Sequence, residues 1–164
     1  MMKKAILLLM IVGLMASCGN DGPKKVNLDA GEKVTTSYAN GTPQVVRTFE
    51  DEDGKLVAVY EKEYYEDGNL LKEGPLSESN RHGQWKTYYR NGNVKIDGSY
   101  IYGVSNDSIR GYYPDETLKF IGVFENGQKT ATWLYYDEKG NLVENKVFMQ
   151  PGEQREGTIV LPKD

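Results

Sequence analysis

The sequence predicts an all-β fold, an antiparallel β-meander of repeated hairpins of about 24 residues that stack into an elongated sheet. Three observations lead to this prediction. Residues of similar type recur 24 positions apart, short stretches alternate apolar and polar side chains, and glycine-containing turns separate these stretches. Eighteen glycines and twelve tyrosines fit short strands and tight turns.

The period is kept at turn, strand and mid-strand positions. It relates Gly68, Gly92 and Gly140; Leu70, Val94, Leu118 and Leu142; Gly74, Gly98 and Gly122; and Trp85, Ile109 and Trp133. A glycine in mid-strand weakens the strand unless a neighbour needs the space, so we expect an adjacent aromatic ring over each of Gly74, Gly98 and Gly122. Tyr136 comes one residue earlier than the period set by Tyr65, Tyr89 and Tyr113 predicts, which indicates an extra residue in the turn 137–140.

Each unit is predicted to contain two strands and two turns. Residues 84–89 alternate in polarity and form the first strand, and Val94–Tyr102 form the returning strand. Between them, Asn91-Gly92 is a strong hairpin signal because both residue types tolerate positive φ. Further turns are expected at 125–127 and 137–140.

The N-terminus has the features of an export signal. Lys3 and Lys4 precede the uncharged apolar run 5–14, which is too short to span a bilayer, and small residues lead to Cys18. This arrangement resembles a bacterial lipoprotein signal. The resemblance implies removal of residues 1–17 and lipid attachment at Cys18, the membrane anchor. An ordinary secretory signal with a chance cysteine is the alternative.

Four segments are expected in the chain. They are a signal peptide at 1–17, a flexible tether at 18–40, a repeat domain at 41–150 whose less regular part 41–60 caps one end, and a C-terminal tail at 151–164 with a possible last strand at Thr158–Leu161. Cleavage would change 20 basic and 24 acidic residues to 18 and 24, a net charge of −6. This balance argues against a nucleic-acid partner.

Three stretches share one motif. They are Gly83–Val94 (G-Q-W-K-T-Y-Y-R-N-G-N-V), Trp133–Leu142 and Tyr64–Leu70, and a fourth copy at Tyr112–Leu118 lacks the turn glycine. The motif resembles the bacterial MORN-repeat variant. That resemblance implies an antiparallel β-meander used as an interaction surface, and many bacterial members are labelled antitoxin-like.

No residue pattern indicates catalysis, a metal or another cofactor. His82 is the only histidine and lies in a predicted turn, whereas a metal site needs several ligands. The acidic run 50–54 lacks the ligand spacing of a calcium-binding EF-hand loop and fits a hairpin turn. The acidic residues recur at turns, which favours a structural role over glycoside cleavage.

A series of aromatic residues is the candidate interaction surface. Its members are Trp85, Tyr89, Tyr113, Trp133 and Tyr135. Aromatic rows on a sheet can bind a protein strand or stack on sugars. The same residues would also form the core of a small one-sheet domain, and this second interpretation is favoured.

These patterns predict a membrane-anchored envelope lipoprotein whose repeat sheet is a non-catalytic protein-interaction module. The partner is expected to be an envelope protein, and the outer membrane is favoured if the cell has two membranes. Two alternatives stay open: an antitoxin or immunity protein that neutralises a toxin, and a glycan-binding envelope component.

Overall fold

The computed structural model describes residues 30–148 and 158–159, and these form strands and turns without a helix. The first five strands are β1 (Gly31–Ser37), β2 (Pro43–Glu52), β3 (Lys55–Tyr64), β4 (Leu70–Ser77) and the short β5 (Asn80–Arg81). The others are β6 (Gly83–Tyr88), β7 (Val94–Ile101), β8 (Val104–Tyr112), β9 (Leu118–Glu125), β10 (Gln128–Tyr136), β11 (Leu142–Phe148) and β12 (Thr158–Ile159).

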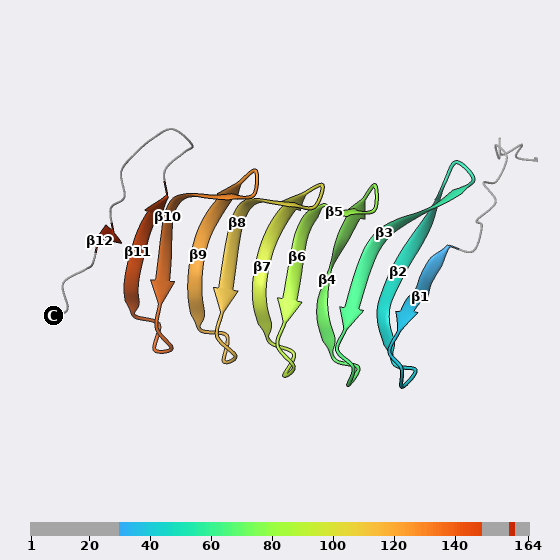
Figure 1. The fold of residues 1–164 in the computed structure, drawn as a ribbon, viewed down its shortest axis with the longest axis horizontal. Helices are drawn as coiled ribbons and strands as arrows, with labels where there is room; N and C mark the ends of the chain where they lie inside the picture. The colour runs from blue at the N-terminus through green and yellow to red at the C-terminus, as the bar shows by residue number, and fades with distance from the viewer. Residues whose placement is uncertain (1–29, 149–157, 160–164) are drawn as a thin grey trace, which may run out of the picture.

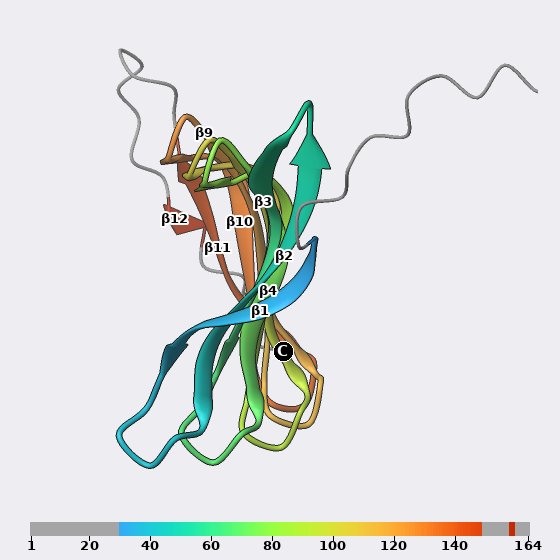
Figure 2. The same cartoon turned by 90° about the vertical axis from the view of Figure 1, so that its right-hand side faces the viewer.

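All strands belong to one open antiparallel sheet. Its order, β1-β2-β3-β4-β6-β7-β8-β9-β10-β11-β12, follows the chain, and β5 pairs with β4 beside this path. Figure 1 shows the strands side by side in an elongated row. Figure 2, seen along the row, shows successive strands rotating in a single twisted layer. The predicted all-β meander of hairpins is therefore confirmed.

Five turns at one end of the strands share the same hydrogen bonds. In each, the first residue's N–H binds the fifth residue's carbonyl, and the fourth residue's N–H binds the first residue's carbonyl. The turns are Tyr38–Thr42, Tyr65–Asn69, Tyr89–Asn93, Tyr113–Thr117 and Asp137–Asn141. The predicted extra residue at 137–140 is therefore wrong. Asp137 occupies the position of Tyr113, and Tyr136 that of Tyr112.

Two-residue turns join the strands at the other end. Residues 53–54, 78–79, 102–103 and 126–127 all have positive φ, as type I′ hairpin turns require. The acidic run 50–54 thus contains the turn between β2 and β3, as predicted.

The N-terminal part of the sheet differs from the prediction. Residues 31–37, expected in the flexible tether, form β1, because pairing to the edge of β2 uses backbone groups and needs little apolar side-chain burial. Residues 41–60 contain most of the regular strands β2 and β3, not an irregular cap. The sequence signal that was missed is Tyr38-x-Asn40-Gly41, which matches Tyr89-x-Asn91-Gly92 in the repeat.

The C-terminal strand was predicted correctly for the two residues that the structure describes there. Thr158 and Ile159 pair with Lys146 and Asn145 of β11. Val160 and Leu161, also predicted in this strand, lie outside the described residues, as do residues 1–29 with Cys18.

Candidate interaction surface

One face of the sheet is built around its mid-strand glycines, and we call it the glycine face. Cross-strand partners lie on the same face of a sheet, so the register places a single row across the strands. From β1 to β9 the row contains Lys33, Arg47, Glu61, Gly74, Trp85, Gly98, Ile109 and Gly122, and Trp133 follows in β10.

Large side chains of the glycine face lie directly over glycines of the neighbouring strand. A Cβ atom on Gly74 would lie 2.5 Å from Cγ of Trp85, and one on Gly122 would overlap the ring of Trp133. The expectation of an aromatic ring over the glycine is confirmed at these two positions. At Gly98 it is wrong, because Ile109 takes the place of a ring.

The two tryptophans are enclosed on their other sides as well. The Arg81 guanidinium lies 4.7 Å from the ring centre of Trp85, and the Lys129 ammonium lies 4.0 Å from that of Trp133. The indole N–H of Trp85 donates a 2.8 Å hydrogen bond to the Pro75 carbonyl. Only 4% of Trp85 and 2% of Trp133 are exposed. Both tryptophans are therefore core residues and present no ring face for a partner or a sugar.

Tyr89 and Tyr113 connect successive units. The hydroxyl of Tyr89 donates to the Tyr112 carbonyl at 2.8 Å, and that of Tyr113 to the Tyr136 carbonyl at 2.9 Å. Tyr38 and Tyr65 do the same towards Tyr64 and Tyr88. These four bonds form a tyrosine ladder along one end of the sheet. The half-buried Tyr89 and Tyr113 thus have a structural role that accounts for their 24-residue spacing.

Tyr135 packs within the aromatic cluster around Trp133. Its ring centre lies 6.3 Å from those of Trp133 and Phe120, and the Lys146 ammonium lies 5.5 Å from it. The structure thus brings Trp133 and Tyr135 together, while Trp85, Tyr89 and Tyr113 belong to other units. Each of the five side chains has packing or hydrogen-bonding neighbours within the sheet.

Towards the N-terminal end of the sheet, the row contains an ion pair between Arg47 and Glu61. Glu61 stands 24 residues before Trp85, at the position of a tryptophan, and only 7% of it is exposed. Arg47 of the adjacent strand binds its carboxylate at 2.7 Å through both Nε and an Nη atom. A paired carboxylate replaces an indole at this position.

The opposite face carries charges of alternating sign, and we call it the charged face. Its central row contains Lys62, Glu73, Lys86, Asp97 and Arg110, each in register with the next. Opposite charges on directly facing cross-strand positions stabilise a sheet modestly. Sequence analysis missed this row, although the 24-residue period relates Lys62, Lys86 and Arg110 to one another and Glu73 to Asp97. The strand register is needed to show that the two sets alternate across the sheet.

Two phenols on the charged face converge on Glu73. The hydroxyl of Tyr88 donates a 2.7 Å hydrogen bond to the Glu73 carboxylate. Burial, together with the bond and charge of Glu73, raises the pKa of Tyr88 above its usual range. Burial, followed by the charge of Glu73, also raises the pKa of Tyr60. Both phenols therefore remain neutral hydrogen-bond donors at neutral pH.

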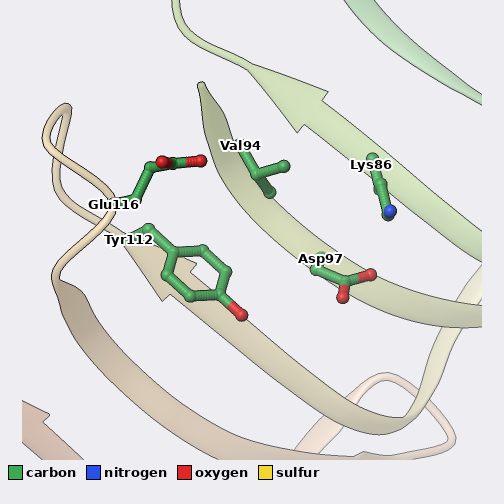
Figure 3. A pocket seen from close by; sticks show the side chains of 5 residues that line it. All are labelled: Lys86, Val94, Asp97, Tyr112 and Glu116. Atoms are coloured by element: carbon green, nitrogen blue, oxygen red, sulfur yellow. The ribbon is translucent and has the colours of Figure 1, made fainter. Parts of the chain in front are cut away.

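A shallow pocket opens beside the charged row, one unit further along. Its volume is about 270 Å³, and Lys86, Val94, Asp97, Tyr112 and Glu116 line it. Figure 3 shows the Glu116 side chain at one end, Lys86 at the other, and the Tyr112 hydroxyl directed towards Asp97. No sequence pattern singled out these residues as a group.

Nothing in the described part of the chain has the geometry of a metal site. No group of three or more His, Cys, Asp or Glu side chains that could hold an ion occurs among residues 30–148 and 158–159. His82 packs against Tyr102, with ring centres 5.0 Å apart. Within the same ranges, no helix is long and apolar enough to cross a membrane.

Comparison with known proteins identifies part of the repeat. Residues 59–77 and 81–102 match the family model described as MORN repeat variant. No curated protein matches the chain. The two matched segments run from β3 into β4 and from β5 through β7, so they cover adjacent units of the observed sheet. These two segments are thus similar to MORN-variant repeats, as the sequence motif predicted for this part of the chain.

Proposed function

We propose that this protein is a lipid-anchored lipoprotein of the cell envelope whose repeat sheet binds another protein without catalysing a reaction. The proposal combines the N-terminal signal features that end at Cys18 with the MORN-variant repeats. Two acyl chains anchor a protein stably, whereas one chain binds only marginally.

The observation that carries the interaction role is the open single-layer sheet. In the described ranges no second layer covers either face. Lys86 and Arg110 of the charged row are exposed, and Lys62, Glu73 and Asp97 are half-buried. Repeat proteins use such extended surfaces for binding. Complementary charges on a partner would orient it along the row and speed association.

Crosslinking in intact cells, followed by affinity capture and mass spectrometry, tests this proposal. We expect a lipid-modified N-terminal peptide beginning at Cys18 and one dominant protein partner. Capture of that partner should fall in the charge-reversal variant Lys86→Glu/Arg110→Glu. The matched control is Lys139→Glu/Lys55→Glu, which makes the same change of charge in a turn and at the start of β3, away from the row.

Two results would contradict the proposal. One is an unmodified N-terminus with no protein enriched over a Cys18→Ala control. The other is turnover of an envelope substrate by the purified protein that a point mutation abolishes.

A further inference from the structure

The pocket at Glu116 differs from the equivalent position of the neighbouring unit in three of its five lining residues. One change is apolar, from Leu70 to Val94, and the other two involve carboxylates. Twenty-four residues earlier, the repeat places Glu73 at the position of Asp97 and Gly92 at that of Glu116. The tyrosine is kept, as Tyr88 in one unit and Tyr112 in the next. Two changes that involve carboxylates and one apolar change thus distinguish this pocket within an otherwise repeated framework.

The first substitution leaves a phenol without its usual partner. Tyr88 donates its hydroxyl proton to Glu73. Asp97 is one methylene shorter than Glu73, and its carboxylate instead accepts a hydrogen bond from the Gln84 amide. Within the described ranges, the Tyr112 hydroxyl forms no hydrogen bond and faces the pocket (Figure 3).

The second substitution places a carboxylate at a backbone position that favours glycine. Gly41, Gly68, Gly92 and Gly140 occupy the fourth position of the other four turns, with φ between 80° and 90°. Glu116 adopts φ 71° at the same position. A side chain in this left-handed region costs roughly 1–2 kcal/mol, and such residues tend to occur at functional sites.

Two carboxylates line the pocket, and of these two only Asp97 has cations among the described residues facing it across the strands. Asp97 lies in register between Lys86 and Arg110, so two cations flank this carboxylate. The Glu116 side chain has no ion pair or hydrogen bond within the part of the chain that the structure describes. Val94 and the Tyr112 ring provide apolar surface next to it.

We infer that this pocket binds a basic side chain, lysine or arginine, presented by a protein partner. The ammonium or guanidinium group would pair with the Glu116 carboxylate. Lys86 would not compete for this carboxylate, because it lies at the far end of the pocket beside Asp97 (Figure 3). The alkyl stem would pack on Val94, and the Tyr112 ring would add a cation–π contact. This inference rests on the proposed protein-binding function and specifies which chemistry one unit recognises.

The test is an NMR titration of the isotopically labelled full chain with N-acetyl-argininamide. We expect saturable shifts of the Tyr112 and Glu116 amide signals. The neutral isostere N-acetyl-citrullinamide, which lacks the charge for this ion pair, should bind about fivefold more weakly. Because a partly exposed ion pair is worth up to about 1 kcal/mol, Glu116→Gln should weaken binding by about fivefold. Glu138→Gln, the same change in the next turn, should leave binding unchanged.

Glu116→Gly separates a binding role from a structural one. It restores the residue found in the other turns, so we expect a higher melting temperature together with arginine binding weakened by about fivefold. Equal binding by this variant and the original chain, or equal shifts with the citrulline compound, would overturn the inference. The titration needs neither a partner nor a membrane. A negative titration would therefore contradict only the inference that this pocket binds a basic side chain. Failure to capture a partner in cells would contradict the proposed function itself.

Discussion

Trp85 lies against the bare backbone of Gly74, so closely that a Cβ atom on the glycine would be 2.5 Å from the indole Cγ. This contact buries one of the two buried apolar side chains among the described residues, the other being Trp133. The stability of a thin, single-layer sheet should depend strongly on such contacts, because no second layer contributes a core.

Gly74→Ala should therefore destabilise the protein by about 1–3 kcal/mol, the usual cost of overpacking. The measurement is urea unfolding. Gly98→Ala is the matched control, because its Cβ would lie 3.2 Å from Cγ1 of Ile109, a flexible side chain that can shift. In Gly98→Ala, the alanine lowers the conformational entropy of the unfolded chain, and this offsets part of the free energy lost through the close contact with Ile109. Equal destabilisation by both variants would contradict a specific role for the ring–glycine contact.

Tyr89→Phe should remove one bond of the tyrosine ladder and lower the free energy of unfolding by about 1 kcal/mol. The phenyl ring retains its packing, so the loss reports the hydrogen bond to the Tyr112 carbonyl. Tyr102→Phe serves as the control because Tyr102 is 51% exposed. Thermal unfolding measures both variants, and the ladder's role would be disproved by two unchanged melting curves.

The repeat period was sufficient to predict the sheet, because each hairpin pairs mainly with its neighbours and local patterns determine its turns. It led to the wrong prediction of an extra residue in the last turn, because each unit contains adjacent tyrosines and Tyr136 matches the first of them, Tyr112, and not the second. β1 was missed because edge pairing through the backbone leaves little periodic side-chain signal.

The candidate site was less predictable. Tryptophan occurs both in protein cores and on binding surfaces, so the residue type of Trp85 does not decide between the two roles. Its burial depends on Gly74 and Arg81, which the fold places next to the indole ring. The charged row and the Glu116 pocket depend on cross-strand register. Bulges shift that register within most strand pairs, so sequence spacing alone does not give it.

Asp115→Asn should reduce the loss of stability in acid. The Thr117 N–H donates to the Asp115 carboxylate at 3.0 Å, and this bond lowers the pKa of Asp115 in the folded state. A lowered folded pKa stabilises the protein above the unfolded value of about 3.9, and this contribution is lost as pH falls through the folded pKa. Asp67 and Asp137 have lowered pKa values in the same type of turn.

Asparagine can replace the aspartate in this role, since Asn91 already accepts the equivalent bond from the Asn93 N–H. Melting temperatures measured between pH 7 and pH 3 should therefore fall less steeply for Asp115→Asn than for the original chain, with similar values at pH 7. An unchanged slope would show that this turn does not contribute to acid sensitivity.

Arg47→Leu should destabilise the sheet by about 2 kcal/mol, because it leaves the Glu61 carboxylate buried without its cation. This is less than the cost of breaking a fully buried pair, since the Arg47 side chain is 40% exposed. The double variant Arg47→Leu/Glu61→Leu should recover most of the loss. It places an apolar residue at a position that Trp85, Ile109 and Trp133 fill in later units.

A double-mutant cycle by urea unfolding, completed with Glu61→Leu, measures this coupling. The expected result is a double variant more stable than Arg47→Leu alone, because replacing both members of a buried ion pair with apolar side chains is often neutral or favourable. Additive losses would mean that the two residues stabilise the sheet independently. In that case the ion pair would not substitute for the missing tryptophan, and the N-terminal unit would rely on strand pairing alone.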